Sequence, residues 1–175
     1  MHAVIHKDFK KFVEERHSPE LYQRALEQVG YDVAHFEAEV YHNDAEIDRM
    51  VNTTAELLSQ SRLDFLTEMG LFGAPGLFEA FKAMIDPEWK TLDLVENIEA
   101  RMHKYVREEF GAFPPSLKPH RISETELKID VLSHRKMAGL AKGFILGFGR
   151  IYGEAITVDV ETSETGYSFT IKKTT

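Results

Sequence analysis

The sequence predicts an α+β fold in which a helical N-terminal part precedes antiparallel strands. Apolar residues recur at helical spacing through roughly the first 110 residues, whereas apolar and polar residues alternate after Pro119. A glycine-rich helix and two further alternating segments complete the chain. Helices followed by strands in this order are typical of α+β domains.

The composition fits one folded domain and excludes several classes of protein. The chain has 175 residues, is 43% hydrophobic and carries a net charge of -8, which argues against a nucleic-acid partner. It has no cysteine, which excludes disulfides, thiolate nucleophiles and iron–sulfur clusters. No apolar run approaches the roughly 18 residues of a membrane span, and the start lacks a signal-peptide pattern. We therefore expect a cytoplasmic protein with no membrane partner.

Four helices are expected in the first part of the chain. The first covers residues 1–17, and the second begins at Ser18-Pro19-Glu20, which is typical of an N-cap with proline in the first turn. Gly30 is expected to end it. A third helical pattern follows residue 44, and a fourth runs from about residue 63 to Gly70.

The segment Gly70–Gly76 is expected to interrupt regular structure. It holds three glycines and one proline in seven residues. A short helix from Phe78 to Ile85 is then expected to end before Pro87.

The next helix carries a candidate metal ligand. On an ideal wheel for residues 92–110, the apolar side chains, Tyr105 and Phe110 among them, share one side. His103 falls about 20° beyond this arc, so it can face the interior from the edge of the apolar side. A partly buried structural histidine is the alternative. Pro114-Pro115 then follows the helix.

A strand with a polar end comes next. Leu127, Ile129 and Val131 alternate onto one face, and Ser133 and Arg135 continue the same parity. Such a face suits a ligand with an apolar body and an anionic rim, because arginine binds carboxylates strongly. As an alternative, Ser133 could cap the following helix.

The last helix and a hairpin close the chain. The helix spans about residues 136–152 and is rich in glycine and alanine, which suggests close approach of another element or a flat ligand. Alternating segments around residues 156–160 and 167–171 predict a β-hairpin.

The order and spacing of His103, Pro115 and Ser133-x-Arg135 resemble the haem-nitric oxide/oxygen binding family, H-NOX, over essentially the whole chain. The resemblance implies haem b (iron protoporphyrin IX) with His103 on the iron and with Ser133 and Arg135 on the propionates. It also implies that Pro115 and Ile5 press on the porphyrin. It further implies a single domain, residues 1–175, with a distal helical lobe over about 1–60 and a proximal lobe over about 61–175.

The chain departs from the family's Tyr-x-Ser-x-Arg motif at one position. Val131 stands where the tyrosine is expected. We expect weaker propionate anchoring as a result, and tighter haem retention after Val131→Tyr. The departure also leaves open a haem-free relative that binds another apolar ligand or serves as a protein-interaction module.

The resemblance also bears on gas selectivity. Oxygen-binding members have a distal tyrosine with supporting partners, and the matching positions here are Leu140, Phe9 and Gly73, none of which donates a side-chain hydrogen bond. We therefore expect ferrous haem that binds NO and CO but not O2. Phe9 and Phe78 are further candidate cofactor contacts, with ordinary core positions as the alternative.

The implied activity is signalling and not catalysis. In the family, NO weakens the iron bond to the histidine, here His103, and the helical lobe shifts against the strand lobe. The partner would be a histidine kinase or a cyclic-dinucleotide signalling enzyme. An enzymatic function finds no support, because the sequence has neither a cysteine nucleophile nor a Gly-x-Ser-x-Gly motif.

Overall fold

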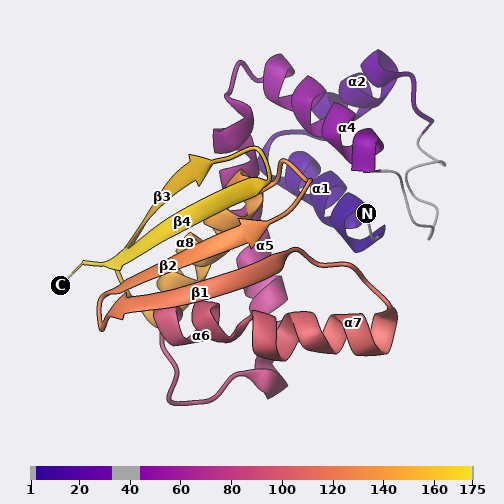
Figure 1. Cartoon of the computed structure of the whole chain (residues 1–175). Helices are drawn as coiled ribbons and strands as arrows, with labels where there is room; N and C mark the ends of the chain where they lie inside the picture. Colours follow the sequence, from indigo (N-terminus) through magenta and orange to yellow (C-terminus); the bar gives the residue numbers. More distant parts are fainter. Residues whose placement is uncertain (1–2, 33–43, 175) are drawn as a thin grey trace.

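The computed structural model describes the backbone of residues 3–32 and 44–174, with side chains from residue 7 onward in that range (Figure 1). Its helices are α1 (Ala3–Arg16), α2 (Pro19–Val29), α4 (Asp44–Leu57), α5 (Arg62–Ala80), α6 (Thr91–Asn97), α7 (Lys104–Phe110) and α8 (Ala138–Tyr152). A 3₁₀ turn spans Lys82–Met84, and a π turn spans Glu99–His103. The strands are β1 (Ser116–Ser123), β2 (Glu126–Leu132), β3 (Ile156–Thr162) and β4 (Gly166–Lys173). The α+β class is confirmed.

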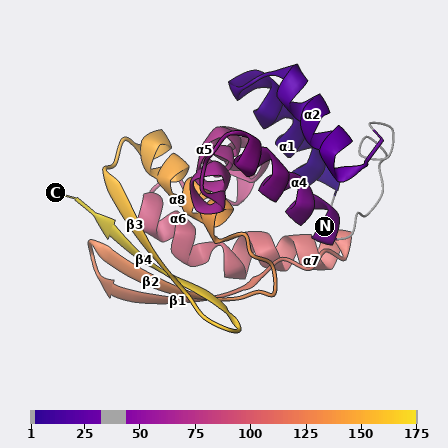
Figure 2. The same cartoon turned by 90° about the horizontal axis from the view of Figure 1, so that it is seen from above.

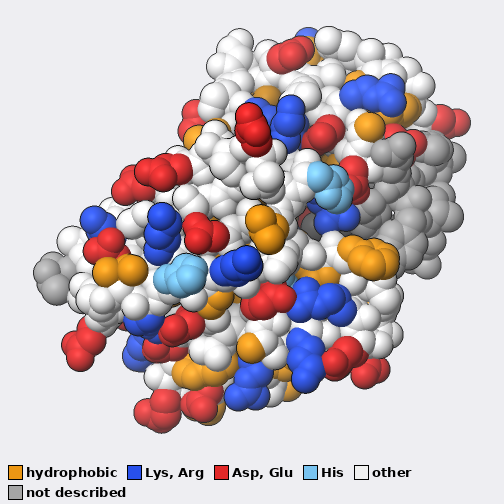
Figure 3. Space-filling view, in the orientation of Figure 1, with side chains coloured by type: hydrophobic (Ala, Val, Ile, Leu, Met, Phe, Trp, Pro, Cys, Tyr) orange, Lys and Arg blue, Asp and Glu red, His pale blue; other side chains and the backbone are white. Residues whose placement is uncertain are grey.

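The four strands form one antiparallel sheet in the order β1-β2-β4-β3. One face of this sheet packs on α6 and α8, while α1, α2 and α4 gather at the other end of the molecule, with α5 and α8 between (Figures 1 and 2). The outer face of the sheet carries interleaved acidic and basic side chains (Figure 3). In the described part of the chain, no helix is long and apolar enough to cross a membrane.

Two apolar cores lie on either side of the α5–α8 pair. One core joins residues of α1, α2, α4 and α5 with Met137 and Leu140. The other joins α6, α8 and the inner face of the sheet, where Leu127, Ile129 and Val131 are buried as the alternation predicts. Phe144 on α8 packs against both cores.

The second predicted helix is confirmed together with both of its ends. The Ser18 hydroxyl accepts a hydrogen bond from the Leu21 amide at 3.1 Å, as an N-cap does. Gly30 ends α2 in the left-handed conformation, with φ 74°, which glycine adopts without strain. The predicted C-terminal hairpin is also confirmed, as β3 and β4.

The predicted break at Gly70–Gly76 is wrong, because α5 runs without interruption through this segment and includes Pro75. The short helix expected from Phe78 is likewise wrong, since Phe78 belongs to α5. A Cβ at Gly70 would overlap the backbone carbonyl of Leu140 on α8. The glycine permits close contact between the two helices, and this packing outweighs its low helix propensity.

The glycines of α8 serve the same contact from the other side. A Cβ at Gly143 would overlap the carbonyl of Thr67 on α5, and one at Gly147 would overlap the side chain of Ala74. Of the two explanations left open by the sequence, close approach of another element therefore accounts for these glycines.

Strand β1 was not predicted. It begins before Pro119 and contains it, whereas the sequence pattern placed the change of period after this proline. Because β1 is an edge strand paired only with β2, a residue without an amide hydrogen is tolerated there.

Candidate functional site

The helix that carries His103 contains a π turn. The amide of His103 donates to the carbonyl of Ile98, five residues earlier, at 2.9 Å. A π turn inserts one residue relative to an α-helix, and such turns are frequent at functional sites.

The ideal wheel is therefore wrong for two aromatic residues beyond this turn. Tyr105 and Phe110, expected on the apolar side, are 37% and 58% exposed. One inserted residue rotates every later position of the helix by about 100°. The His103 side chain, expected at the edge of the apolar side, is only 18% exposed.

Glu99 holds one nitrogen of the His103 ring. Glu99 Oε2 lies 3.1 Å from His103 Nδ1, which leaves Nε2 as the nitrogen available to a metal. Burial lowers the pKa of His103, although the Glu99 carboxylate and the Pro115 carbonyl act in the opposite direction. A lowered pKa favours the neutral imidazole, whose unprotonated nitrogen can ligate a metal.

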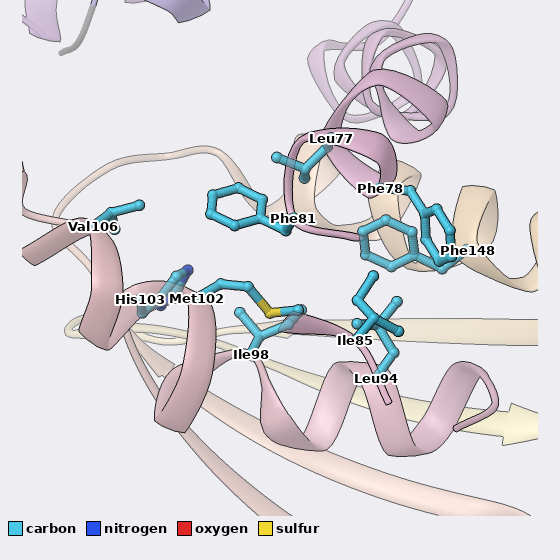
Figure 4. Close-up of a pocket in the computed structure, with 10 residues that line it drawn as sticks. All are labelled: Leu77, Phe78, Phe81, Ile85, Leu94, Ile98, Met102, His103, Val106 and Phe148. Carbon is cyan, nitrogen blue, oxygen red and sulfur yellow. The ribbon is translucent and has the colours of Figure 1, made fainter. Parts of the chain in front are cut away.

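His103 lines an otherwise apolar pocket between α5, α6, the π turn and α8. Figure 4 shows its ring at one end of the pocket, with Phe78 and Phe148 at the other. The space that these side chains leave unfilled is about 410 Å³, part of which is open solvent. The lining residues are Leu77, Phe78, Phe81, Ile85, Leu94, Ile98, Met102, His103, Val106 and Phe148.

Ser133 and Arg135 do not line this pocket. Arg135 Nε donates to Asp44 Oδ2 at 2.8 Å, and Arg135 Nη1 donates to the Phe113 carbonyl at 2.8 Å. Ser133 Oγ accepts from the Arg135 amide at 3.1 Å. The alternative that Ser133 caps the following helix is wrong, because Met137 precedes α8 and no side chain caps it.

The segment after α7 connects the two groups of candidate residues. The Pro115 carbonyl hydrogen-bonds with the His103 ring, and the Phe113 carbonyl accepts a hydrogen bond from Arg135. Two residues of one short loop thus contact the predicted iron ligand on one side and the predicted propionate ligand on the other.

Tyr167 lies on β4 directly opposite Val131, where the sequence lacks the motif tyrosine. Both side chains are buried on the inner face of the sheet. Burial raises the pKa of Tyr167, while a hydrogen bond with Ser133 and the charge of Arg135 oppose this rise. A phenol therefore lies beside the Ser133–Arg135 pair, supplied by another strand.

The remaining candidates fall in different places. Phe78 lines the pocket, whereas Phe9 and Leu140 are buried in the helical core, next to α5. Gly73 faces Phe144 on α8. Ile5 belongs to α1, but its side chain lies outside the described residues.

The donor set suits a metal that brings most of its own ligands. Since His103 is the single imidazole in the pocket lining, with the Met102 thioether beside it, iron in a porphyrin fits, because the macrocycle supplies four nitrogens and has an apolar body. No group of three or more metal-ligating side chains was found among the described residues.

Three further polar residues of this region were not singled out from the sequence. Glu99 was detectable as an i, i+4 neighbour of His103. Asp44 and Tyr167 were not, because they approach Arg135 and Ser133 only through tertiary packing.

The chain is similar in sequence to proteins that bind haem and NO. The family model described as Haem-NO-binding matches residues 2–160. No curated protein sequence matched the chain.

Solved structures of H-NOX proteins share the fold. The unliganded Fe(II) H-NOX protein from K. algicida superimposes with a TM-score of 0.88 at 16% identity, covering 100% of this chain and 97% of that one. The S. oneidensis H-NOX protein in the Fe(II)NO ligation state gives 0.87 at 16% identity, with 100% of both chains covered. The I5F mutant of T. Tengcongensis H-NOX gives 0.84 at 18% identity, covering 100% and 98%. The chain belongs to the Haem-NO-binding family.

Proposed function

We propose that this chain binds haem b through His103 and acts as a sensor of NO and CO. The observation that carries the proposal is His103 itself, a largely buried imidazole with Nδ1 held by Glu99 and the rest of its pocket apolar. Membership of the Haem-NO-binding family supports a haem-based sensor in place of an enzyme.

Each candidate residue has a distinct task in this proposal. His103 holds the iron, and Phe78 and the other apolar side chains keep water from its face. Ser133 and Arg135 anchor the propionates, and Pro115 and Ile5 press on the porphyrin. When bound, the haem iron supplies the gas-binding position.

Gas selectivity rests on side chains that lack hydrogen-bond donors. Bound dioxygen carries partial negative charge and needs a donor, whereas NO and CO largely do not. Leu140, Phe9 and Gly73 offer none. We therefore propose that the site rejects O2.

The proposed output is a change of surface that a histidine kinase or a cyclic-dinucleotide enzyme reads. We assign about residues 1–60 to a distal lobe and about 61–175 to a proximal lobe. Asp44 at the start of α4 binds Arg135, which follows β2, so this ion pair spans the division. A ligand that acts on Arg135 would therefore also act on the contact between lobes.

The test is haem uptake by the purified chain. We expect a Soret band with hemin, its loss in His103→Ala, and its return when imidazole is added. His120→Ala is a matched control, because His120 is an exposed histidine on β1. The ferrous protein should bind NO and CO and give no stable oxygenated spectrum in air. Failure of the wild type to bind hemin would refute haem binding, and a stable oxygenated form would refute the selectivity.

A specific observation supports a second candidate, a haem-free relative. Arg135 already holds the carboxylate of Asp44, so a propionate would have to share or displace it. Val131 also supplies no hydroxyl. A chain that stays colourless with hemin but binds a small apolar molecule in the same pocket would favour this candidate.

A further inference from the structure

Glu99 joins three separate elements through one carboxylate. Its Oε2 accepts from His103 Nδ1 at 3.1 Å and from the backbone amide of Leu117 on β1 at 3.1 Å. Its Oε1 accepts from Arg107 on α7. The carboxylate is therefore fixed from three directions, and its orientation toward the histidine is set by contacts outside its own turn.

The π turn brings this carboxylate into contact with the His103 ring. Glu99 begins the turn and His103 ends it. With more than four residues per turn, positions 99 and 103 lie on one face, and the ring nitrogen nearest the backbone meets the carboxylate. Nε2, at the far end of the ring, is left for the pocket (Figure 4).

The pair differs from an ordinary surface ion pair of the same spacing. Lys104 and Glu108, also four residues apart, are 64% and 62% exposed and lie 4.0 Å apart. His103 and Glu99 are 18% and 25% exposed. Partial burial and a shorter contact strengthen the hydrogen bond, because solvent screens it less.

The contact with Glu99 also bears on the tautomer of the ring. A carboxylate oxygen accepts hydrogen bonds, so the 3.1 Å contact favours the tautomer with hydrogen on Nδ1.

We propose that Glu99 is the positioning residue of His103, the histidine that would hold the iron: it fixes the Nδ1–H tautomer, aims Nε2 into the pocket and would make Nε2 a stronger donor to iron. The proposal rests on the proposed haem-binding function. A carboxylate that accepts a hydrogen bond from the ring nitrogen not bound to the metal raises the basicity of the nitrogen that is bound. Removing such a carboxylate typically costs about 10- to 100-fold in metal affinity.

The first test needs no haem. Nitrogen-15 NMR of the haem-free chain at about pH 8, where an imidazole is neutral, reports the His103 tautomer directly. We expect Nδ1–H in the wild type, a shift toward Nε2–H in Glu99→Ala, and recovery of Nδ1–H in Glu99→Gln, which keeps an acceptor oxygen. Glu96→Ala is the control, because Glu96 precedes the same turn but binds Arg121. An unchanged tautomer in Glu99→Ala would overturn the proposal.

The second test uses the haem-loaded chain. Glu99→Ala should bind hemin about 10- to 100-fold more weakly. Its reduction potential should rise, because a weaker donor stabilises Fe(III) less. Glu99→Gln should lie between Glu99→Ala and the wild type, and Glu96→Ala should match the wild type. Circular dichroism of each variant verifies that the fold is kept.

Different results would refute haem binding and the proposed role of Glu99. If the wild type takes up no hemin, the proposed function fails whatever the tautomer. If the wild type binds hemin and Glu99→Ala has the same affinity and reduction potential, haem binding stands and the role of Glu99 is refuted.

Discussion

At the scale of single residues, Tyr167 supplies a hydroxyl close to the position where Val131 replaces the motif tyrosine. The two lie opposite each other on β4 and β2, and both are buried. The phenol shares a hydrogen bond with Ser133, so a tyrosine hydroxyl lies beside Ser133 although position 131 supplies none. The same packing bears on Val131→Tyr, since a second ring on this face would need space that Tyr167 fills, and overpacking costs about 1–3 kcal/mol. Any gain in haem retention from that substitution has to exceed this cost.

Removing the phenol hydroxyl isolates its contribution. Tyr167→Phe keeps the ring and should weaken hemin binding by about 2- to 12-fold, equivalent to one hydrogen bond of about 0.5–1.5 kcal/mol. Tyr105→Phe is the control, because Tyr105 is a partly exposed tyrosine on α7. The measurement is the rate of hemin transfer to a haem scavenger. Equal rates for Tyr167→Phe and the wild type would show that Ser133 and Arg135 act without this phenol.

At the scale of elements, the contact between α5 and α8 depends on glycine. Gly143 lies where a Cβ would meet the Thr67 backbone, which cannot move aside as a flexible side chain can. α8 carries Phe148 of the pocket, and α5 carries Phe78. The distance between the two helices therefore also sets the width of the pocket.

Gly143→Ala should destabilise the fold and Gly76→Ala should not. The first forces α5 and α8 apart, and we expect a loss of about 1–3 kcal/mol in the free energy of unfolding, the usual cost of overpacking. Gly76 is also helical, in α5, but nothing lies within 4 Å of an added Cβ, so alanine there should leave stability equal or raise it by up to about 1 kcal/mol. Urea unfolding followed by circular dichroism compares the two. Equal stability of both variants would contradict the close contact.

Elements with local signals were predictable and those decided by packing were not. Helix α2 has its cap residues in the sequence, and β2 has strict alternation. The π turn that ends at His103 was missed, because a wheel assumes one constant rotation per residue. Gly70 was assigned to a loop because glycine disfavours a helix. The contact that keeps it helical is with Leu140 on α8, 70 residues away along the chain, so no local pattern reveals it.

At the scale of the whole molecule, Asp44 joins the helical end to the strand end. Its carboxylate accepts from Arg135 Nε at 2.8 Å and from His134 Nε2 at 3.1 Å. These residues are about ninety positions apart in sequence, so no local pattern predicts the contact. Burial alone would raise the pKa of Asp44, but these hydrogen bonds and the Arg135 charge contribute to lowering it to about 2.

This low pKa makes the contacts of Asp44 with Arg135 and His134, the junction between the helical end and the strand end, sensitive to acid. Because the folded pKa of about 2 lies below the unfolded value of about 3.9, Asp44 stabilises the fold above about pH 4, and the stabilisation is lost as the pH falls toward 2. Since the ion pair is partly solvated, we expect a contribution of about 1 kcal/mol. Asp44→Asn should remove this part of the loss in unfolding free energy between about pH 6 and pH 3, measured by urea unfolding. Asp159→Asn, at an exposed site on β3, should keep the wild-type pH dependence. If Asp44→Asn loses as much stability on acidification as the wild type, the acid sensitivity arises elsewhere and the junction does not depend on this carboxylate.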